Sequence, residues 1–132
     1  MEAKLPARTN VFQKVILLAK RHSAPESTVT ESAMLLDRHT GAEREVDICI
    51  RTTIADHSVV ISIECTDTSR PADVGWIDRM KAKHERLPTN SLVLVSRSGF
   101  SEEALKVARL NGIEALALEA VRRPPFVSST RL

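Results

Sequence analysis

The spacing of hydrophobic residues changes along this chain, and that change constrains the fold more than any other feature. Apolar residues between positions 10 and 21 recur at helical intervals, which predicts a helix over that range. Asn10 can cap this helix, and Gln13 stands three residues later, as in a capping box. After the break at residues 22–27 the period becomes two, which is the period of a β-strand. The chain therefore begins as a helix and continues as a sheet.

Three successive segments with this shorter period predict an antiparallel meander. They span residues 28–37, 44–51 and 58–66. In the middle segment, alternation places on one face Val46, Ile48 and Ile50, and on the other Glu45, Asp47 and Cys49. The third segment is apolar and rich in β-branched residues, which is typical of a strand at the centre of a sheet.

The second half of the chain alternates between helices and strands. The predicted elements are a helix over residues 71–87, a strand over 91–96, a helix over 101–112 and a strand over 113–118. Asp73 and Ser101 are suitable N-caps, and Gly112 is a suitable helix end. The expected order is α-β-β-β-α-β-α-β, an α/β fold in which helices flank one mixed central sheet. We expect this domain to occupy residues 10–118, between a flexible lead-in (1–9) and an irregular tail (119–132).

The size and charge of the chain narrow its function without choosing one. Its 132 residues suit a single domain, and its net charge of +2 at pH 7 predicts that any basic surface is local. Cys49 and Cys65 are too few for a disulfide framework, which favours a reduced, cytoplasmic protein. The chain has no apolar run of the ~20 residues that a membrane helix needs, and its first ten residues lack a secretory signal. We therefore expect no membrane association.

Two acidic residues interrupt the predicted strands. Glu64 shares a strand face with Val60, Ser62 and Thr66, and Asp47 lies on the neighbouring strand. A carboxylate buried in such a place is costly unless a positive group meets it. Two acids on adjacent strands can share a divalent cation, which prefers oxygen ligands. The alternative is that both acids lie near strand ends and are solvated.

Three passages carry a resemblance to a known family. They are REVDICI (44–50), VVISIECTD (59–67) and LVLVSRSGFSEEALKVARLNGIEAL (92–116). With the element order, they resemble the PD-(D/E)XK nuclease superfamily, which has the restriction-endonuclease-like fold, and within it the Mrr-like restriction-endonuclease group. The resemblance covers about residues 10–118. It implies a metal-dependent DNA endonuclease that uses Mg²⁺ or Mn²⁺ to activate water.

The resemblance assigns roles to individual residues. Asp47 matches the aspartate of the motif, and Glu64 matches the acid of the (D/E)XK tripeptide. Thr66 stands at the lysine position and carries no cation, so the catalytic lysine has to come from elsewhere. The family often adds an acid from the first helix, and Glu31 is the stand-in that this sequence offers.

A lysine of the predicted helix 71–87 can replace the missing one, and the choice between two candidates is angular. Lys83 lies near a stripe made of Trp76, Met80 and Leu87, whereas Lys81 lies toward the flank of Ile77 and Asp78. We therefore predict Lys83 as the catalytic cation. The alternative is a surface lysine whose stem covers apolar surface.

Basic residues near the site are the predicted DNA contacts. Arg79, Lys81 and Arg97 are placed to hold phosphates, although charge clusters on helices are usually solvated faces. A homodimer or a partner chain is a candidate source of sequence specificity. Two alternatives stay open. One is a catalytically degraded member of the same fold that serves DNA binding or assembly, and the other is a structural or partner-binding domain without nucleic acid.

Overall fold

The computed structural model describes residues 10–118, so the expected lead-in and tail lie outside the described residues. Its elements are α1 (Asn10–His22), β1 (Thr28–Leu36), β2 (Glu43–Ile54), β3 (His57–Thr66), α2 (Val74–Glu85), β4 (Ser91–Ser96), α3 (Glu102–Leu110) and β5 (Glu114–Ala117). The predicted α/β order is confirmed. Within residues 10–118, no helix is long and apolar enough to cross a membrane.

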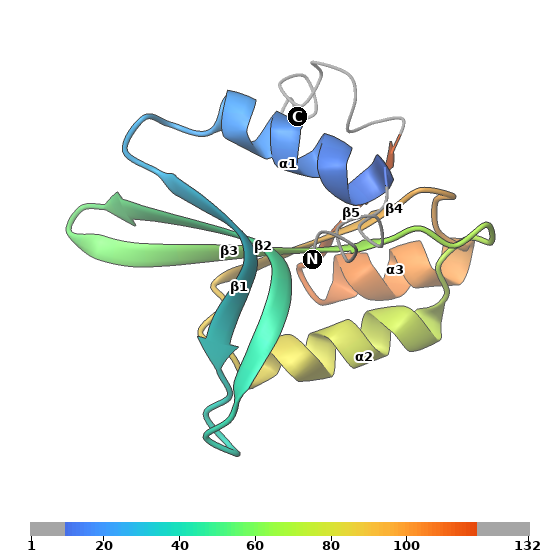
Figure 1. The fold of residues 1–132 in the computed structure, drawn as a ribbon. Coiled ribbons are helices and arrows are strands. Elements are labelled where there is room, and N and C mark those ends of the chain that lie inside the picture. Colours follow the sequence, from blue (N-terminus) through green and yellow to red (C-terminus); the bar gives the residue numbers. More distant parts are fainter. Residues whose placement is uncertain (1–9, 119–132) are drawn as a thin grey trace, which may run out of the picture.

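The five strands form one mixed sheet in the order β1-β2-β3-β4-β5. The pairs β1–β2 and β2–β3 are antiparallel, as the predicted meander requires, and β3–β4 and β4–β5 are parallel. Helix α1 covers one face of the sheet, and α2 and α3 cover the other (Figure 1). Strand β3 is central and buried from both sides, so its alternating side chains enter two different layers.

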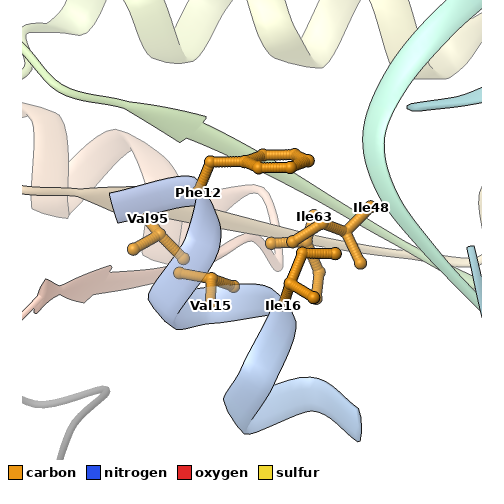
Figure 2. Close-up of a cluster of buried hydrophobic side chains, with 6 residues drawn as sticks. All are labelled: Phe12, Val15, Ile16, Ile48, Ile63 and Val95. Carbon is orange, nitrogen blue, oxygen red and sulfur yellow. The ribbon is translucent and has the colours of Figure 1, made fainter. Parts of the chain in front are cut away.

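The two layers have separate hydrophobic cores. On the α1 side, helix and sheet side chains meet in one cluster (Figure 2), which contains Phe12, Val15, Ile16, Ile48, Ile63 and Val95. On the opposite side, α2 and α3 pack on β4 through Ile77, Leu92, Leu94, Ala104, Ala108 and Ile113. A third cluster fills the space under the β1–β2 hairpin with Ala33, Leu35, Val46, Cys49, Val60 and Leu87.

The prediction that Val46 shares a face with Ile48 and Ile50 is wrong. Val46 packs with Cys49, whereas Ile48 and Ile50 contact the α1 layer. Two breaks in strand pairing accompany this change. The β2–β3 ladder ends at Ile48, so Val46 lies where β2 no longer pairs with β3. The β1–β2 register keeps its alignment but omits the opposed pair Ser32 and Asp47, where Ser32 has a left-handed φ of 51°. Strand β2 curls beyond this point toward the end of α2 (Figure 1).

Helix α2 begins later than the predicted residue 71. Ala72 forms a β-bridge with Phe100, which holds the preceding residues extended. Asp73 is the N-cap, as predicted, and its side chain accepts a hydrogen bond from the Trp76 N–H. Ser101 caps α3 in the same way, through the N–H of Ala104. Both helix starts are therefore fixed by side chains that the sequence identifies.

A buried acid fastens the β1–β2 hairpin to the end of α2. Asp37 Oδ1 accepts hydrogen bonds from the N–H groups of His39 (2.8 Å) and Thr40 (3.1 Å), and Arg86 Nε lies 3.2 Å from Asp37 Oδ2. Burial raises the pKa of Asp37, but these hydrogen bonds and the charge of Arg86 lower it below its usual value. The Arg38 N–H also donates to the Arg86 carbonyl (2.8 Å). The hairpin and the C-terminal end of α2 are thus held together.

The packing of α2 generates a stability prediction with a matched control. Ile77 is fully buried (0% exposed), whereas Ile54 is 61% exposed at the β2–β3 turn. We expect Ile77→Ala to lower the free energy of unfolding by about 2–5 kcal/mol, because it leaves a cavity under α2. Ile54→Ala should change it by no more than about 0.5 kcal/mol. Urea unfolding measures both, and equal effects would contradict this packing.

Candidate active site

The two predicted acids meet where β2 separates from β3. The β2–β3 ladder ends at the pair Ile48 and Ile63. Beyond it the Asp47 N–H donates to Glu64 Oε1 (3.2 Å), and the Cys65 N–H donates to Asp47 Oδ2 (2.8 Å). Each carboxylate therefore accepts a main-chain hydrogen bond from the other strand. We call Asp47, Glu64 and Cys65 the fork.

Two positive or polar groups from α2 contact the buried end of Glu64. Glu64 is 4% exposed, and its Oε2 lies 2.7 Å from Lys83 Nζ and 2.7 Å from His84 Nε2. Burial raises the pKa of Glu64, but the hydrogen bonds and charges of His84 and Lys83 bring it below its usual value. The carboxylate is therefore ionised at neutral pH. Lys83 Nζ also donates to the Glu45 carbonyl (2.7 Å), so it bridges α2, β2 and β3.

The stripe of Trp76, Met80 and Leu87 is not the face on which α2 meets the sheet. The buried residues of the helix are Ile77 and His84, two turns apart, while Trp76 and Met80 are only partly buried. The face that meets the sheet is thus centred on Ile77, which the prediction placed on a flank. Lys83 reaches Glu64 from the edge of this face. Its catalytic role stays a prediction.

Lys81 lies away from the acids. Its Nζ lies 2.7 Å from Glu85 Oε2 in an i,i+4 pair at the surface. Lys83, and not Lys81, is therefore the lysine that contacts Glu64.

The other predicted site residues lie apart from the contacts between Asp47, Glu64 and Lys83. Thr66 ends β3 on the Glu64 face and is opposite Ser96 in the β3–β4 register. Glu31 is exposed on β1, where it is opposite Ile48. Arg79 is exposed on α2, and Arg97 forms an ion pair with Asp67. Among residues 10–118, the structure brings together Asp47, Glu64 and Lys83. The four residues just described lie outside the contacts that join these three.

His84 is the site residue that the sequence analysis did not single out. It is 6% exposed, its Nε2 contacts Glu64, and its Nδ1 lies 2.7 Å from Thr89 Oγ1. A signal was present, because His84 follows Ile77 by seven residues and precedes Leu87 by three. Those spacings place His84 on one helical stripe with two apolar residues. The sequence-based stripe of Trp76, Met80 and Leu87 did not include it.

The chain has the restriction-endonuclease-like fold, with one mixed sheet, the predicted element order, and Asp47 and Glu64 on β2 and β3. No protein-family model and no curated protein sequence matches the chain. Solved structures, however, are similar to it in fold.

Two of these structures show the shared fold. AF1548, a protein of unknown function, is 17% identical, with a TM-score of 0.66 over 87% of this chain and 60% of its own. The MspJI restriction endonuclease, solved in complex with a 27-mer oligonucleotide, is 16% identical. It has a TM-score of 0.57 over 89% of this chain and 28% of its own. This chain therefore corresponds to part of each protein.

The fork suits the divalent cation that the resemblance implies. Asp47 and Glu64 supply carboxylate oxygens from adjacent strands, and main-chain hydrogen bonds hold both side chains in place. Among residues 10–118 there is no group of three or more His, Cys, Asp or Glu side chains suited to a metal. Magnesium does not require one, because it binds through one or two carboxylates and keeps water and substrate phosphates as its other ligands.

The lowered pKa of Glu64 predicts how acid affects stability. A carboxylate whose folded pKa lies below its unfolded pKa stabilises the protein above the unfolded pKa, and that stability is lost as the pH falls through the folded pKa. We expect Glu64→Gln to cost about 3 kcal/mol at neutral pH, because it leaves Lys83 without its counter-charge. The difference from wild type should shrink as the pH falls below about 4.

Unfolding measured from about pH 7 to about pH 3 tests this expectation. Glu85→Gln is the control, since the Glu85 side chain is 61% exposed and pairs with Lys81 at the surface. Its effect should be small at every pH. A Glu64→Gln deficit that stays constant down to acid pH would contradict the ionised, stabilising Glu64.

Proposed function

We propose that this chain is a metal-dependent endonuclease that hydrolyses phosphodiester bonds of DNA at the fork. The observation that carries the proposal is the meeting of Asp47, Glu64 and Lys83 at one point of the sheet. Two carboxylates and one ammonium are the groups that the resemblance assigns to the reaction. They come from β2, β3 and α2, three separate elements of the chain that folding brings together.

Each residue has a task in this reaction. Asp47 and Glu64 would hold Mg²⁺ or Mn²⁺, which lowers the pKa of a bound water and neutralises the phosphate. Lys83 supplies a cation beside Glu64, where it can donate to a phosphate oxygen or position the attacking water. It therefore takes the place of the lysine that Thr66 does not provide. Its side chain is 14% exposed, so it keeps some access to a substrate.

DNA is the proposed substrate. The support is the restriction-endonuclease-like fold, together with MspJI, which has this fold in a structure with an oligonucleotide. Arg79, Lys81 and Arg97 are exposed or partly exposed and can meet backbone phosphates around the fork. We also propose that a second copy or a partner chain supplies sequence specificity.

A second function has one observation in its favour. Glu64 Oε2 is already contacted by both Lys83 and His84, as in an ion pair that serves stability, and Thr66 brings no further cation. These contacts suit a degraded member of the fold that acts in DNA binding or assembly. The two functions differ in one property, which is cleavage in the presence of metal.

A cleavage assay on supercoiled plasmid and linear DNA with Mg²⁺ or Mn²⁺ tests the proposal. We expect cleavage by the wild type and none detectable for Asp47→Asn or Glu64→Gln, because each loses an anionic metal ligand. Lys83→Met should reduce the rate by at least about 100-fold, since a transition-state cation is lost.

Lys81→Met is the matched control for Lys83→Met, because it removes a lysine of the same helix that does not contact Glu64. At saturating DNA its rate should stay near that of the wild type, because losing a phosphate contact weakens DNA binding modestly and does not remove the cation beside Glu64. Salt-dependent DNA binding without cleavage by any protein would favour the degraded domain. Equal loss of activity in both lysine variants would contradict the special role of Lys83.

Metal binding gives a prediction that does not depend on turnover. Calorimetric titration with Mn²⁺ should show binding to the wild type and none to Glu64→Ala. Lys83→Met should bind Mn²⁺ several-fold more tightly than the wild type, because a positive charge 2.7 Å from Glu64 Oε2 opposes a cation there. Tighter binding with lost cleavage would separate Lys83 from the metal ligands. Weaker binding in Lys83→Met would contradict this division.

A further inference from the structure

A row of hydrogen bonds lies behind Glu64, and the proposed reaction does not use it. Glu64 Oε2 lies 2.7 Å from His84 Nε2, His84 Nδ1 lies 2.7 Å from Thr89 Oγ1, and Thr89 Oγ1 lies 2.8 Å from Ser62 Oγ. Ser62 is 0% exposed, and it precedes Glu64 by two residues on the same face of β3. The row therefore leaves β3, passes through α2 and the following loop, and returns to β3.

The chemistry of these groups fixes one end of the row. The ionised Glu64 carboxylate can only accept hydrogen bonds, so His84 Nε2 must carry a proton and donate it to Glu64. The other ring nitrogen, Nδ1, pairs with the Thr89 hydroxyl, and Thr89 pairs in turn with the Ser62 hydroxyl. A hydroxyl can donate or accept, so both pairs can form in either direction. The two hydroxyl groups thus hold the ring in the orientation in which Nε2 faces Glu64.

We propose that His84 is a positioning residue, which holds the Glu64 carboxylate in the orientation that binds the metal. Thr89 and Ser62 act through His84, because they hold the orientation of its ring. This inference rests on the proposed function for the identity of the metal site. It goes beyond that function because it assigns a role to three residues that the motif does not include.

His84 and Lys83 contact the same oxygen but should act differently. The His84 side chain is 4% exposed and has partners on both ring nitrogens, so its position is fixed. A carboxylate that is already oriented loses less conformational freedom when the metal binds, and such supporting hydrogen bonds strengthen metal sites. Loss of His84 should therefore weaken metal binding, whereas loss of Lys83 should strengthen it.

Calorimetric titration of the full chain with Mn²⁺ measures this difference. We expect His84→Ala to weaken binding by about 10- to 100-fold, which is typical when a supporting partner of a ligand is lost. His84→Gln should recover most of the affinity, because its amide N–H can again donate to Glu64. His57→Gln is the matched control, since His57 is an exposed histidine at the start of β3. The Mn²⁺ affinity of this variant should equal that of the wild type. A His84→Gln variant that is folded and as weak as His84→Ala would overturn the proposal.

Nuclear magnetic resonance tests the same role without metal or DNA. The wild type should show a protonated His84 Nε2 that is hydrogen-bonded to Glu64, and an ordered Glu64 side chain. Thr89→Val, which removes one hydroxyl outside α2, should weaken that hydrogen bond and increase Glu64 side-chain motion, even if His84→Ala does not fold. A His84 Nε2 without a proton in the wild type, or an unchanged Glu64 in Thr89→Val, would overturn the positioning role. Wild-type protein that shows these signatures but binds no Mn²⁺ would refute the proposed function alone.

Discussion

The contact between Glu64 and the end of α2 is the interaction on which the rest of the structure depends. A carboxylate that is 4% exposed on a central strand is tolerated only because Lys83 and His84 approach it from the helix. This contact determines where α2 lies on the sheet. Asp37 makes the matching contact with Arg86 just beyond the helix, so two buried acids hold the same end of α2. The hydrophobic face centred on Ile77 then packs the rest of α2 against β4 and α3.

The separation of β2 from β3 turns this structural contact into a site. Main-chain N–H groups that lose their ladder partners need other acceptors, and the carboxylates of Asp47 and Glu64 provide them. The same two side chains are the proposed metal ligands. Stability and chemistry therefore share the same atoms, and a substitution that removes charge at the fork changes both. Asp47→Asn, Glu64→Gln and Lys83→Met keep the shape of the side chain and remove its charge, so stability has to be measured beside activity in each.

The sequence predicted the features that depend on local pattern. The order of elements, the caps at Asp73 and Ser101 and the two acids follow from periodicity and motif. What it missed depends on backbone or long-range geometry. Val46 enters another core than Ile48 because β2 separates from β3 beyond Ile48, and a left-handed Ser32 interrupts the pairing with β1, which no alternation rule anticipates. The buried stripe of α2 and the partner of His84 depend on how the helix is rotated against β3, which a single helix pattern with several partly apolar faces does not determine.

The central claim is that the fork binds the divalent cation, and paramagnetic broadening by Mn²⁺ tests it most directly. In a spectrum of the ¹⁵N-labelled chain, substoichiometric Mn²⁺ should broaden the amide signals of Asp47 and Cys65 first, because these N–H groups bond to the two carboxylates. Excess Mg²⁺ should restore the signals. Broadening centred instead on Glu102 and Glu103, in the acidic first turn of α3, would show that the cation binds elsewhere and would contradict the account.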